Sequence, residues 1–217
     1  VSAHMNLAGV LVRQGRRDEA LPHFRRSIEL TPDNPALYFS LAVFQVQQGQ
    51  ADEAIASFRK TIELDPRSAA AHSNLARLLV ERGDVDEAID FLRRAVELDP
   101  DALTAYGPLV QLLRQRGRAS DAAKYEALAA KAGRRRAEIE NRRGIELARE
   151  GKLQAATAQF QATIALAPNF AEAHTNLADA LARQGNFDGA IAHYRRALEI
   201  DPGLASARQR LQQLVNP

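Results

Sequence analysis

The sequence repeats itself every 34 residues. The phrase AHMNLA at 3–8 returns as AHSNLA at 71–76 and as AHTNLA at 173–178. The starts of these phrases differ by 68 and 102 residues, which are two and three multiples of 34. A fixed period of this length is typical of chains built from stacked supersecondary units. The period therefore constrains the fold more than any other feature of the sequence.

Cutting the chain every 34 residues from Val1 divides it without any insertion. We call the nth residue of a block place n. Place 15 is always glycine, place 20 is always alanine, and place 32 is proline except at Arg134. The predicted repeats are 1–34, 35–68, 69–102, 103–136, 137–170 and 171–204, followed by a remnant at 205–217.

Each block reads as two helices. Leu7, Ala8 and Leu11 in its first half, and Ala20 and Phe24 in its second, follow the three-and-four spacing of a helix face. Glycine at place 15 ends the first helix because it adopts the left-handed conformation cheaply. Acidic residues then begin the second helix, where backbone N–H groups and the dipole favour negative charge. The proline at place 32 prevents that helix from continuing.

The blocks share small or apolar residues at places 7 and 8, alanine at 20, an aromatic at 24, a small residue at 27 and proline at 32. With this pattern the chain resembles the tetratricopeptide-repeat family over essentially its whole length. The resemblance implies an all-α fold, a right-handed superhelix of six helix-turn-helix repeats with a C-terminal capping helix. Each helix pair covers its apolar face only by stacking against its neighbours.

The two ends of the chain differ. Residues 204–215 place Leu204, Ala207, Leu211, Leu214 and Val215 on one face of a helix whose other face is polar, as a cap requires. The first helix has no such cap, so Leu7 and Leu11 should each expose one side. We therefore expect a piece cut from a longer chain, with a first repeat that is open to self-association.

The fourth block departs most from the pattern. Pro108 lies inside its first helix, Glu126 replaces the aromatic, and KAGRRR replaces the usual LDP ending. A proline beyond the first turn removes a backbone hydrogen bond and kinks a helix. We expect a distorted or late-starting helix near Pro108 and a hinge at 133–136.

The residue inventory argues against an enzyme. Cysteine is absent, and no phosphate-binding loop, HExxH motif or GxSxG elbow occurs. The five histidines, at places 4 and 23 of different repeats, are too far apart to share a metal and are interpreted as packing residues. No cofactor is expected, and no apolar run suggests direct membrane insertion. The compartment is not determined; the cytoplasm is the default.

The family resemblance assigns binding to places 2, 5, 6, 9, 12 and 13, on the concave face. These places are apolar in the first three repeats and mostly polar and cationic later. The candidate peptide-binding residues are Asn6, Phe39, Val43, Val46, Asn74, Arg77, Gln111, Arg114, Asn141, Arg142 and Asn176.

The asparagines at place 6 have their own interpretation. Asn6, Asn74 and Asn176 each offer a donor and an acceptor, which can pair with the backbone of an extended ligand. The arrangement resembles the asparagine ladder in the repeat arm of O-linked N-acetylglucosamine transferase, whose repeats also read AHSNLA. The ladder is interrupted by Ser40, Pro108 and Arg142. Simple solvation of the groove remains the alternative.

The carboxylate clamp of chaperone-binding family members is missing. It needs Lys, Asn, Asn, Lys and Arg at places 5, 9, 6, 2 and 6 of three successive repeats, whereas repeats one to three offer Met5, Gly9, Ser40, Ala70 and Asn74. Repeats four to six offer Gly107, Gln111, Arg142, Glu172 and Asn176. A chaperone C-terminal tail is therefore rejected as a partner.

Three functional hypotheses remain. The favoured one is a non-catalytic protein–protein interaction scaffold that binds an acidic peptide or protein segment with apolar anchors in the concave groove. The second is a substrate-selecting or assembly arm of a larger enzyme such as a glycosyltransferase. The third, a nucleic-acid binder, uses the basic stretch from Arg114 to Lys152, which has twelve basic and six acidic residues. It is disfavoured because no aromatic residues interleave with the arginines.

Overall fold

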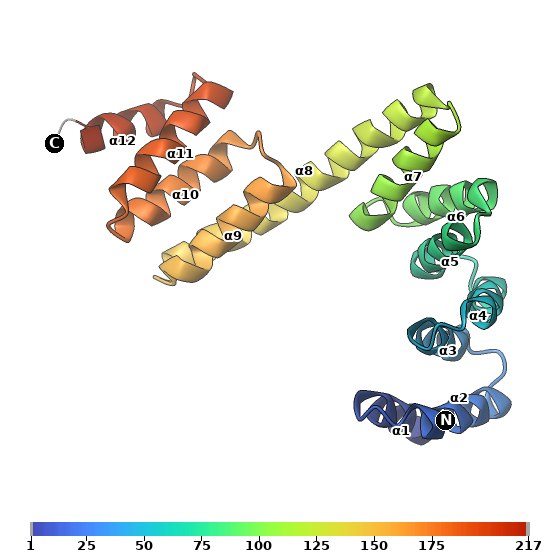
Figure 1. Cartoon of the computed structure of the whole chain (residues 1–217). Helices are drawn as coiled ribbons and strands as arrows, with labels where there is room; N and C mark the ends of the chain where they lie inside the picture. The colour runs from blue at the N-terminus through green and yellow to red at the C-terminus, as the bar shows by residue number, and fades with distance from the viewer. Residues whose placement is uncertain (1, 216–217) are drawn as a thin grey trace. The chain divides into compact units, whose positions relative to one another are not determined.

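The computed structural model describes residues 2–215, and within that range the chain has twelve helices and no strand (Figure 1). The all-α expectation is thus confirmed. The chain divides into two compact units, Val1–Glu126 and Ala127–Pro217. The helices are α1 (Ser2–Arg13), α2 (Arg17–Leu30), α3 (Pro35–Gln47), α4 (Ala51–Leu64), α5 (Ala69–Arg82), α6 (Val85–Leu98), α7 (Leu103–Gln115), α8 (Ala119–Arg149), α9 (Leu153–Leu166), α10 (Ala171–Arg183), α11 (Phe187–Ile200) and α12 (Ala205–Val215).

The turn inside each repeat is set by glycine, as predicted. Gly83 has a φ of 96°, and the following Asp84 N–H bonds the carbonyl of Leu79 at 2.8 Å. This left-handed residue closes the C-terminal end of α5 and reverses the chain into α6. The same positive φ occurs at the other place-15 glycines, Gly15, Gly49, Gly117, Gly151 and Gly185.

Small side chains at two places let the helices of a repeat approach closely. Ala8 on α1 and Ala20 on α2 are fully buried, and so are their counterparts Ala42, Ala54, Ala76 and Ala88. Large side chains from place 24, such as Phe24, Phe58 and Phe160, then fill the space between helices. Because apolar burial is the main source of stability, these seams form the core.

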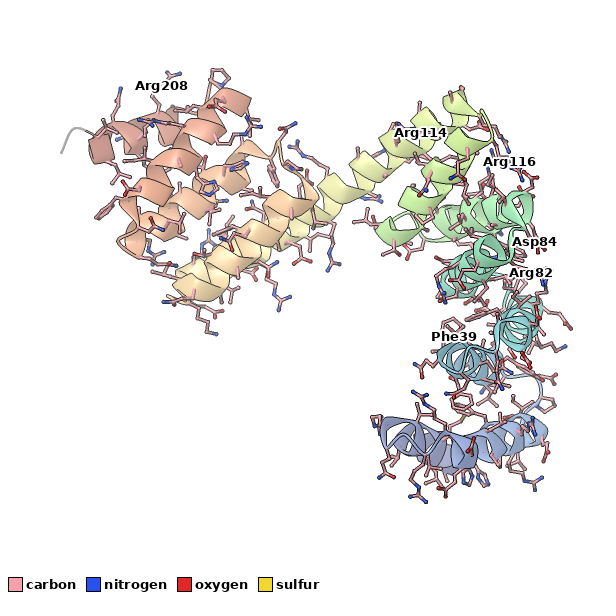
Figure 2. All side chains as sticks on the ribbon, viewed as in Figure 1. Phe39, Arg82, Asp84, Arg114, Arg116 and Arg208 are labelled. Carbon is pink, nitrogen blue, oxygen red and sulfur yellow. The ribbon has the colours of Figure 1, made fainter. Side chains whose placement is uncertain are left out.

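Arginines also connect successive repeats at the exposed edge of the first unit. Arg116 Nη2 lies 3.0 Å from Asp86 Oδ2, and Arg82 Nη1 lies 3.7 Å from Asp52 Oδ1. Figure 2 labels the two arginines. Both pairs join place 14 of one repeat to place 18 of the repeat before it. Exposed ion pairs of this kind contribute less than about 1 kcal/mol each, so they support the stacking without dominating it.

The recurring histidine at place 4 has a structural role. His72 Nε2 lies 3.1 Å from the carbonyl oxygen of Pro66, and His174 Nε2 lies 3.0 Å from that of Pro168. The Tyr106 hydroxyl, at the same place, donates to the carbonyl of Pro100 at 3.1 Å. The place-4 side chain therefore links its helix by a hydrogen bond to the proline turn six residues earlier.

Place 4 also faces place 23 of the same repeat. The rings of His4 and His23 stack with centroids 5.2 Å apart, and those of His174 and His193 with centroids 5.3 Å apart. Phe91 takes the same position beside His72. The histidines are packing residues, as expected, but the expected wide separation is wrong for these two pairs, because places 4 and 23 of one repeat are in contact.

A continuous helix crosses the expected boundary between repeats four and five. Residues 133–136 lie inside α8, which fuses the second helix of repeat four with the first helix of repeat five. Arg134 replaces the proline that stops the other second helices, and Arg134 and Arg136 pair with Glu138 and Glu140 one turn later. Good helix formers joined by such pairs continue the helix where proline would end it. The turn is absent; a hinge at this place remains a prediction.

Pro108 does not delay its helix. α7 begins at Leu103, which is place 1 of its block, so the expected late start is wrong. Tyr106 and Leu109 on either side of the proline are buried.

The ends largely follow expectation. α12 packs on α11, with Ala207 buried and Leu204, Leu211 and Leu214 partly buried, although Val215 is exposed. At the other end Leu7 is 43% exposed, whereas Leu11 is buried with Phe24 in the core of the first repeat. The expectation of exposure is therefore confirmed for Leu7 and wrong for Leu11.

Candidate functional site

The predicted binding residues are distributed over both units, and each unit has its own pockets. Asn6, Phe39, Val43, Val46, Asn74, Arg77, Gln111 and Arg114 belong to the first unit, and Asn141, Arg142 and Asn176 belong to the second. All of these residues lie on α1, α3, α5, α7, α8 or α10, which carry the first helices of the repeats.

A pocket of about 330 Å³ lies between α3, α4 and α5 in the first unit. Phe39 lines it together with Ser40 and Ala70, and the Phe39 ring meets the edge of Phe58 with centroids 5.5 Å apart. Val43 and Val46, further along α3, are half-buried. Phe39 and its neighbours can therefore offer apolar contact to a ligand (Figure 2).

A second pocket of about 470 Å³ lies between α5, α6 and α7. Asn74, Arg77 and Val80 of α5 line it opposite Thr104 and Pro108 of α7. Arg77 Nη1 lies 2.8 Å from Glu81 Oε1, and Asn74 Nδ2 donates to the Ala70 carbonyl of its own helix at 2.9 Å. One N–H of the Asn74 amide is therefore used in a hydrogen bond to its own helix, while its Oδ1 can accept a hydrogen bond from a ligand.

The remaining candidates of the first unit lie on α1 and α7. Asn6 and Gln111 are exposed. Arg114, labelled in Figure 2, is also exposed. It forms an ion pair with Glu126, the residue that replaces the place-24 aromatic. A partner that binds Arg114 must therefore compete with a carboxylate from α8.

The largest of these pockets, about 610 Å³, lies in the second unit. Ile145, Phe160, Ala180 and Leu214 give it apolar lining, and Arg149, Arg183 and Arg210 give it positive charge. Asn176 and Asp179 of α10, with Tyr194 and Gln213, add further polar groups. Pockets of about 300 to 1,000 Å³ with a mostly apolar lining and a few polar groups are typical ligand sites.

Asn141 and Asn176 are brought together by this arrangement. Asn176 Nδ2 donates to Asn141 Oδ1 at 3.1 Å, from α10 to α8. Asn141 is only 7% exposed, whereas Asn176 lines the pocket. The neighbouring Arg142 is exposed on α8. Of the three candidates in this unit, Asn176 is the one that contributes to the pocket lining.

Two of the pocket arginines are held in place. Arg210 of α12 forms an ion pair with Asp179, which also accepts a hydrogen bond from the Tyr194 hydroxyl. Arg183 Nη1 donates to the Ala148 carbonyl at 3.0 Å, at the C-terminal end of α8. Burial raises the pKa of Tyr194, so the hydroxyl stays protonated and donates to the Asp179 carboxylate. Arg210 was not predicted, because the sequence of α12 suggested only a cap.

The basic cluster at 134–136 of α8 contains arginines that already contact side chains of the second unit. Arg134 lies 4.8 Å from the centroid of the Phe170 ring and pairs with Glu138, while Arg136 pairs with Glu140. Within residues 2–215, no group of three or more histidine or acidic side chains is placed to hold a metal ion. No helix in that range is long and apolar enough to cross a bilayer.

Comparison with known proteins decides the family. A family model described as the cilia and flagella-associated protein 70 C-terminal domain, a tetratricopeptide-repeat model, matches residues 1–214. The chain belongs to this tetratricopeptide-repeat family. The resemblance seen in the sequence is thereby confirmed, while the similarity to the O-linked N-acetylglucosamine transferase arm is not. Among curated proteins, no sequence matches significantly.

Solved tetratricopeptide-repeat structures share the fold. One is MamA, 21% identical, with a TM-score of 0.53 and coverage of 94% of this chain and 93% of that chain. Another is PilF of Pseudomonas aeruginosa, 19% identical, with a TM-score of 0.52 and coverage of 98% and 96%. At such identities the likeness establishes the fold alone. Tetratricopeptide-repeat folds are typical of protein-interaction scaffolds.

Proposed function

We propose that the chain is a non-catalytic protein-interaction scaffold that binds an acidic peptide segment with apolar anchors on the first helices of its repeats. The observation that carries the proposal is the pocket between α5, α6 and α7. There Arg77 and its ion-pair partner Glu81 line the same space as Val80, Leu92 and Pro108, so charged and apolar groups face one space. Apolar side chains supply contact area, and arginine selects carboxylates through paired hydrogen bonds.

An acidic ligand would have to displace the glutamates that already pair with Arg77, which lines this pocket, and with Arg114, which lies outside it. Arg77 and Arg114 are 47% and 64% exposed at their side chains, and each is paired with one glutamate. Exposed pairs contribute little to stability, so exchanging Glu81 or Glu126 for a ligand carboxylate costs little. The arginines thus remain usable for binding.

A peptide suits the structure better than a nucleic acid. Arg134 and Arg136 of the basic cluster are paired with glutamates on their own helix, and Arg134 also packs on Phe170. Stacking platforms for bases require exposed aromatic rings close to such arginines. Phe170 is buried beside Arg134, so it cannot serve as one.

The test uses fluorescein-labelled synthetic peptides rich in Glu, Leu and Phe, with a matched set in which Lys replaces Glu. Fluorescence anisotropy of the full chain should detect binding of the acidic set alone. The double variant Arg77→Glu and Arg114→Glu should weaken it about tenfold or more, because two attractive contacts become repulsive. Equal affinity of the double variant and the wild type would refute the role of these arginines.

The matched control changes two arginines on second helices. Arg26 of α2 and Arg94 of α6 are exposed and pair with Glu29 and Glu97, so Arg26→Glu and Arg94→Glu make the same charge change. This control should bind the acidic peptides as the wild type does. An equal loss in the control would show that net charge, and not the first-helix surface, governs binding.

A further inference from the structure

The pocket of the second unit has a net positive lining. Its charged side chains are Arg149, Arg183, Arg210 and Asp179, three positive and one negative, which gives a net charge of +2. Within residues 2–215, no carboxylate lies within ion-pair distance of Arg149, which is exposed at the end of α8. An anionic ligand would balance this charge.

The pocket also has a place for apolar contact. Phe160 of α9, Ile145 of α8 and Leu214 of α12 line the same space as the arginines. Phe160 is almost fully buried, whereas Ile145 and Leu214 keep part of their surface accessible. A ligand with both a carboxylate and a bulky apolar side chain would use both kinds of lining.

Asn176 adds a group suited to a peptide backbone. Its amide donates one N–H to Asn141, so its Oδ1 and its second N–H have no other partner among the described residues. One acceptor and one donor on a single amide match the N–H and C=O of a peptide unit. A simple anion such as phosphate would use the arginines but not this pairing.

We infer that this pocket binds an acidic peptide segment, in which a carboxylate lies against Arg149 and a neighbouring apolar side chain lies against Ile145 and Leu214. The inference rests on the proposed function and gives the second unit of the chain a defined binding site. Arg210 reaches the pocket from the capping helix α12, so that helix both covers the last repeat and completes the site. Asp179 holds Arg210 and competes with the ligand for it.

The test measures anisotropy of the acidic peptides with three variants of the full chain. Arg149→Glu changes the net lining charge from +2 to 0 and should weaken binding about tenfold. Asp179→Asn changes it from +2 to +3 and should strengthen binding about threefold, because it removes the carboxylate that competes with the ligand for Arg210. Asparagine keeps an oxygen for the Tyr194 hydroxyl. Arg195→Glu alters an exposed arginine of α11 outside the pocket and should leave binding unchanged.

The outcomes separate this inference from the proposed function. If the wild type binds no acidic peptide, the proposed function fails. If it binds, and only the Arg77 and Arg114 variant weakens it, the pocket assignment alone fails. If Asp179→Asn weakens binding, or if Arg195→Glu acts as strongly as Arg149→Glu, the assignment is likewise overturned. If a random single-stranded oligonucleotide bound as tightly as the peptides and lost as much affinity in Arg149→Glu, the peptide assignment would be overturned, because the pocket would then bind anions in general.

Discussion

His174 Nδ1 lies 3.1 Å from His193 Nδ1, in a contact that joins α10 to α11. The carbonyl of Pro168 can only accept a hydrogen bond, so His174 Nε2, 3.0 Å away, must carry a proton. In the neutral pair, His174 Nδ1 is then the acceptor and His193 Nδ1 the donor. One added proton can bind at His193 Nε2. A second proton would have to bind at His174 Nδ1, where its N–H would face the N–H of His193 Nδ1.

This contact predicts a loss of stability in mild acid. Burial, and then the charge of His174, lower the pKa of His193 in the folded chain. The unfolded chain therefore binds the proton more readily, and the free energy of unfolding falls as the pH drops through about 6.5 towards the lower folded pKa. Above about pH 6.5 the full stability is present. Urea unfolding at several pH values, followed by hydrogen exchange in α10 and α11, measures this.

The chain supplies the control for that prediction. Phe91 packs against His72 at the equivalent place of repeat three, so His193→Phe should keep the ring contact while removing the titrating group. The variant should show a smaller loss of stability between neutral and mildly acidic pH. An unchanged pH dependence in His193→Phe would mean that other groups cause it.

Gly144 should not tolerate even a methyl group. A Cβ at this place in α8 would lie 2.5 Å from Phe160 Cε1, and Phe160 is 1% exposed and cannot move into solvent. Gly144→Ala should therefore cost about 1 to 3 kcal/mol, despite the better helix propensity of alanine. Urea denaturation measures the change.

Gly107 provides the opposite case. It lies inside α7, and a Cβ there would meet nothing within 4 Å. Gly107→Ala should stabilise the chain by up to about 1 kcal/mol, because alanine favours the helix and restricts the unfolded chain. If both alanine variants shift stability in the same direction, the close approach of α8 and α9 at Gly144 is not the controlling factor.

The continuity of α8 depends on the missing proline. Arg134→Pro restores the residue found at place 32 of the other repeats and should cost about 3 kcal/mol, because proline removes a hydrogen bond and clashes with the preceding turn. Circular dichroism should report lost helix. Arg134→Ala removes the contacts with Glu138 and Phe170 and should keep the helix. Full helicity in the proline variant would show that the absence of proline at place 32 is not what keeps α8 continuous.

The place-4 contact with the proline turn can be tested at Tyr106. Its hydroxyl donates to the Pro100 carbonyl at 3.1 Å, and the residue is 3% exposed, so Tyr106→Phe should cost about 1 kcal/mol. Tyr38 occupies the same place in repeat two but is half-buried, with no hydroxyl partner among the described residues. Tyr38→Phe should change the free energy of unfolding by less than about 0.5 kcal/mol. If Tyr106→Phe and Tyr38→Phe lowered the free energy of unfolding equally, the hydrogen bond from Tyr106 to Pro100 would have no stabilising role.

The sequence predicted the repeats well where one residue decides the local structure. The place-15 glycines have a positive φ, and helices begin and end where the period places them, because these effects act within a turn or two. Arg134 was the visible exception to the proline rule, and its consequence is the continuous α8. That outcome depended on the helix-forming residues and ion pairs that follow, which the period does not describe.

The site was harder to predict because it depends on contacts between repeats. The sequence proposed Asn141, Arg142 and Asn176 as equals, but packing buries Asn141, exposes Arg142 and places Asn176 in the pocket. Arg210 escaped notice because it lies on the capping helix. A period assigns equivalent places the same role, whereas burial and ion pairs differ from one repeat to the next.

The most direct test of the account is photo-crosslinking of the full chain with an acidic Glu, Leu and Phe peptide that carries a benzophenone group. Mass spectrometry then identifies the crosslinked residues. Crosslinks are expected on α3, α5, α7 and α10 and on the pocket residues of α8 and α12, and they should be lost in high salt. Crosslinks concentrated on the second helices α2, α4 and α6, or unaffected by salt, would contradict it.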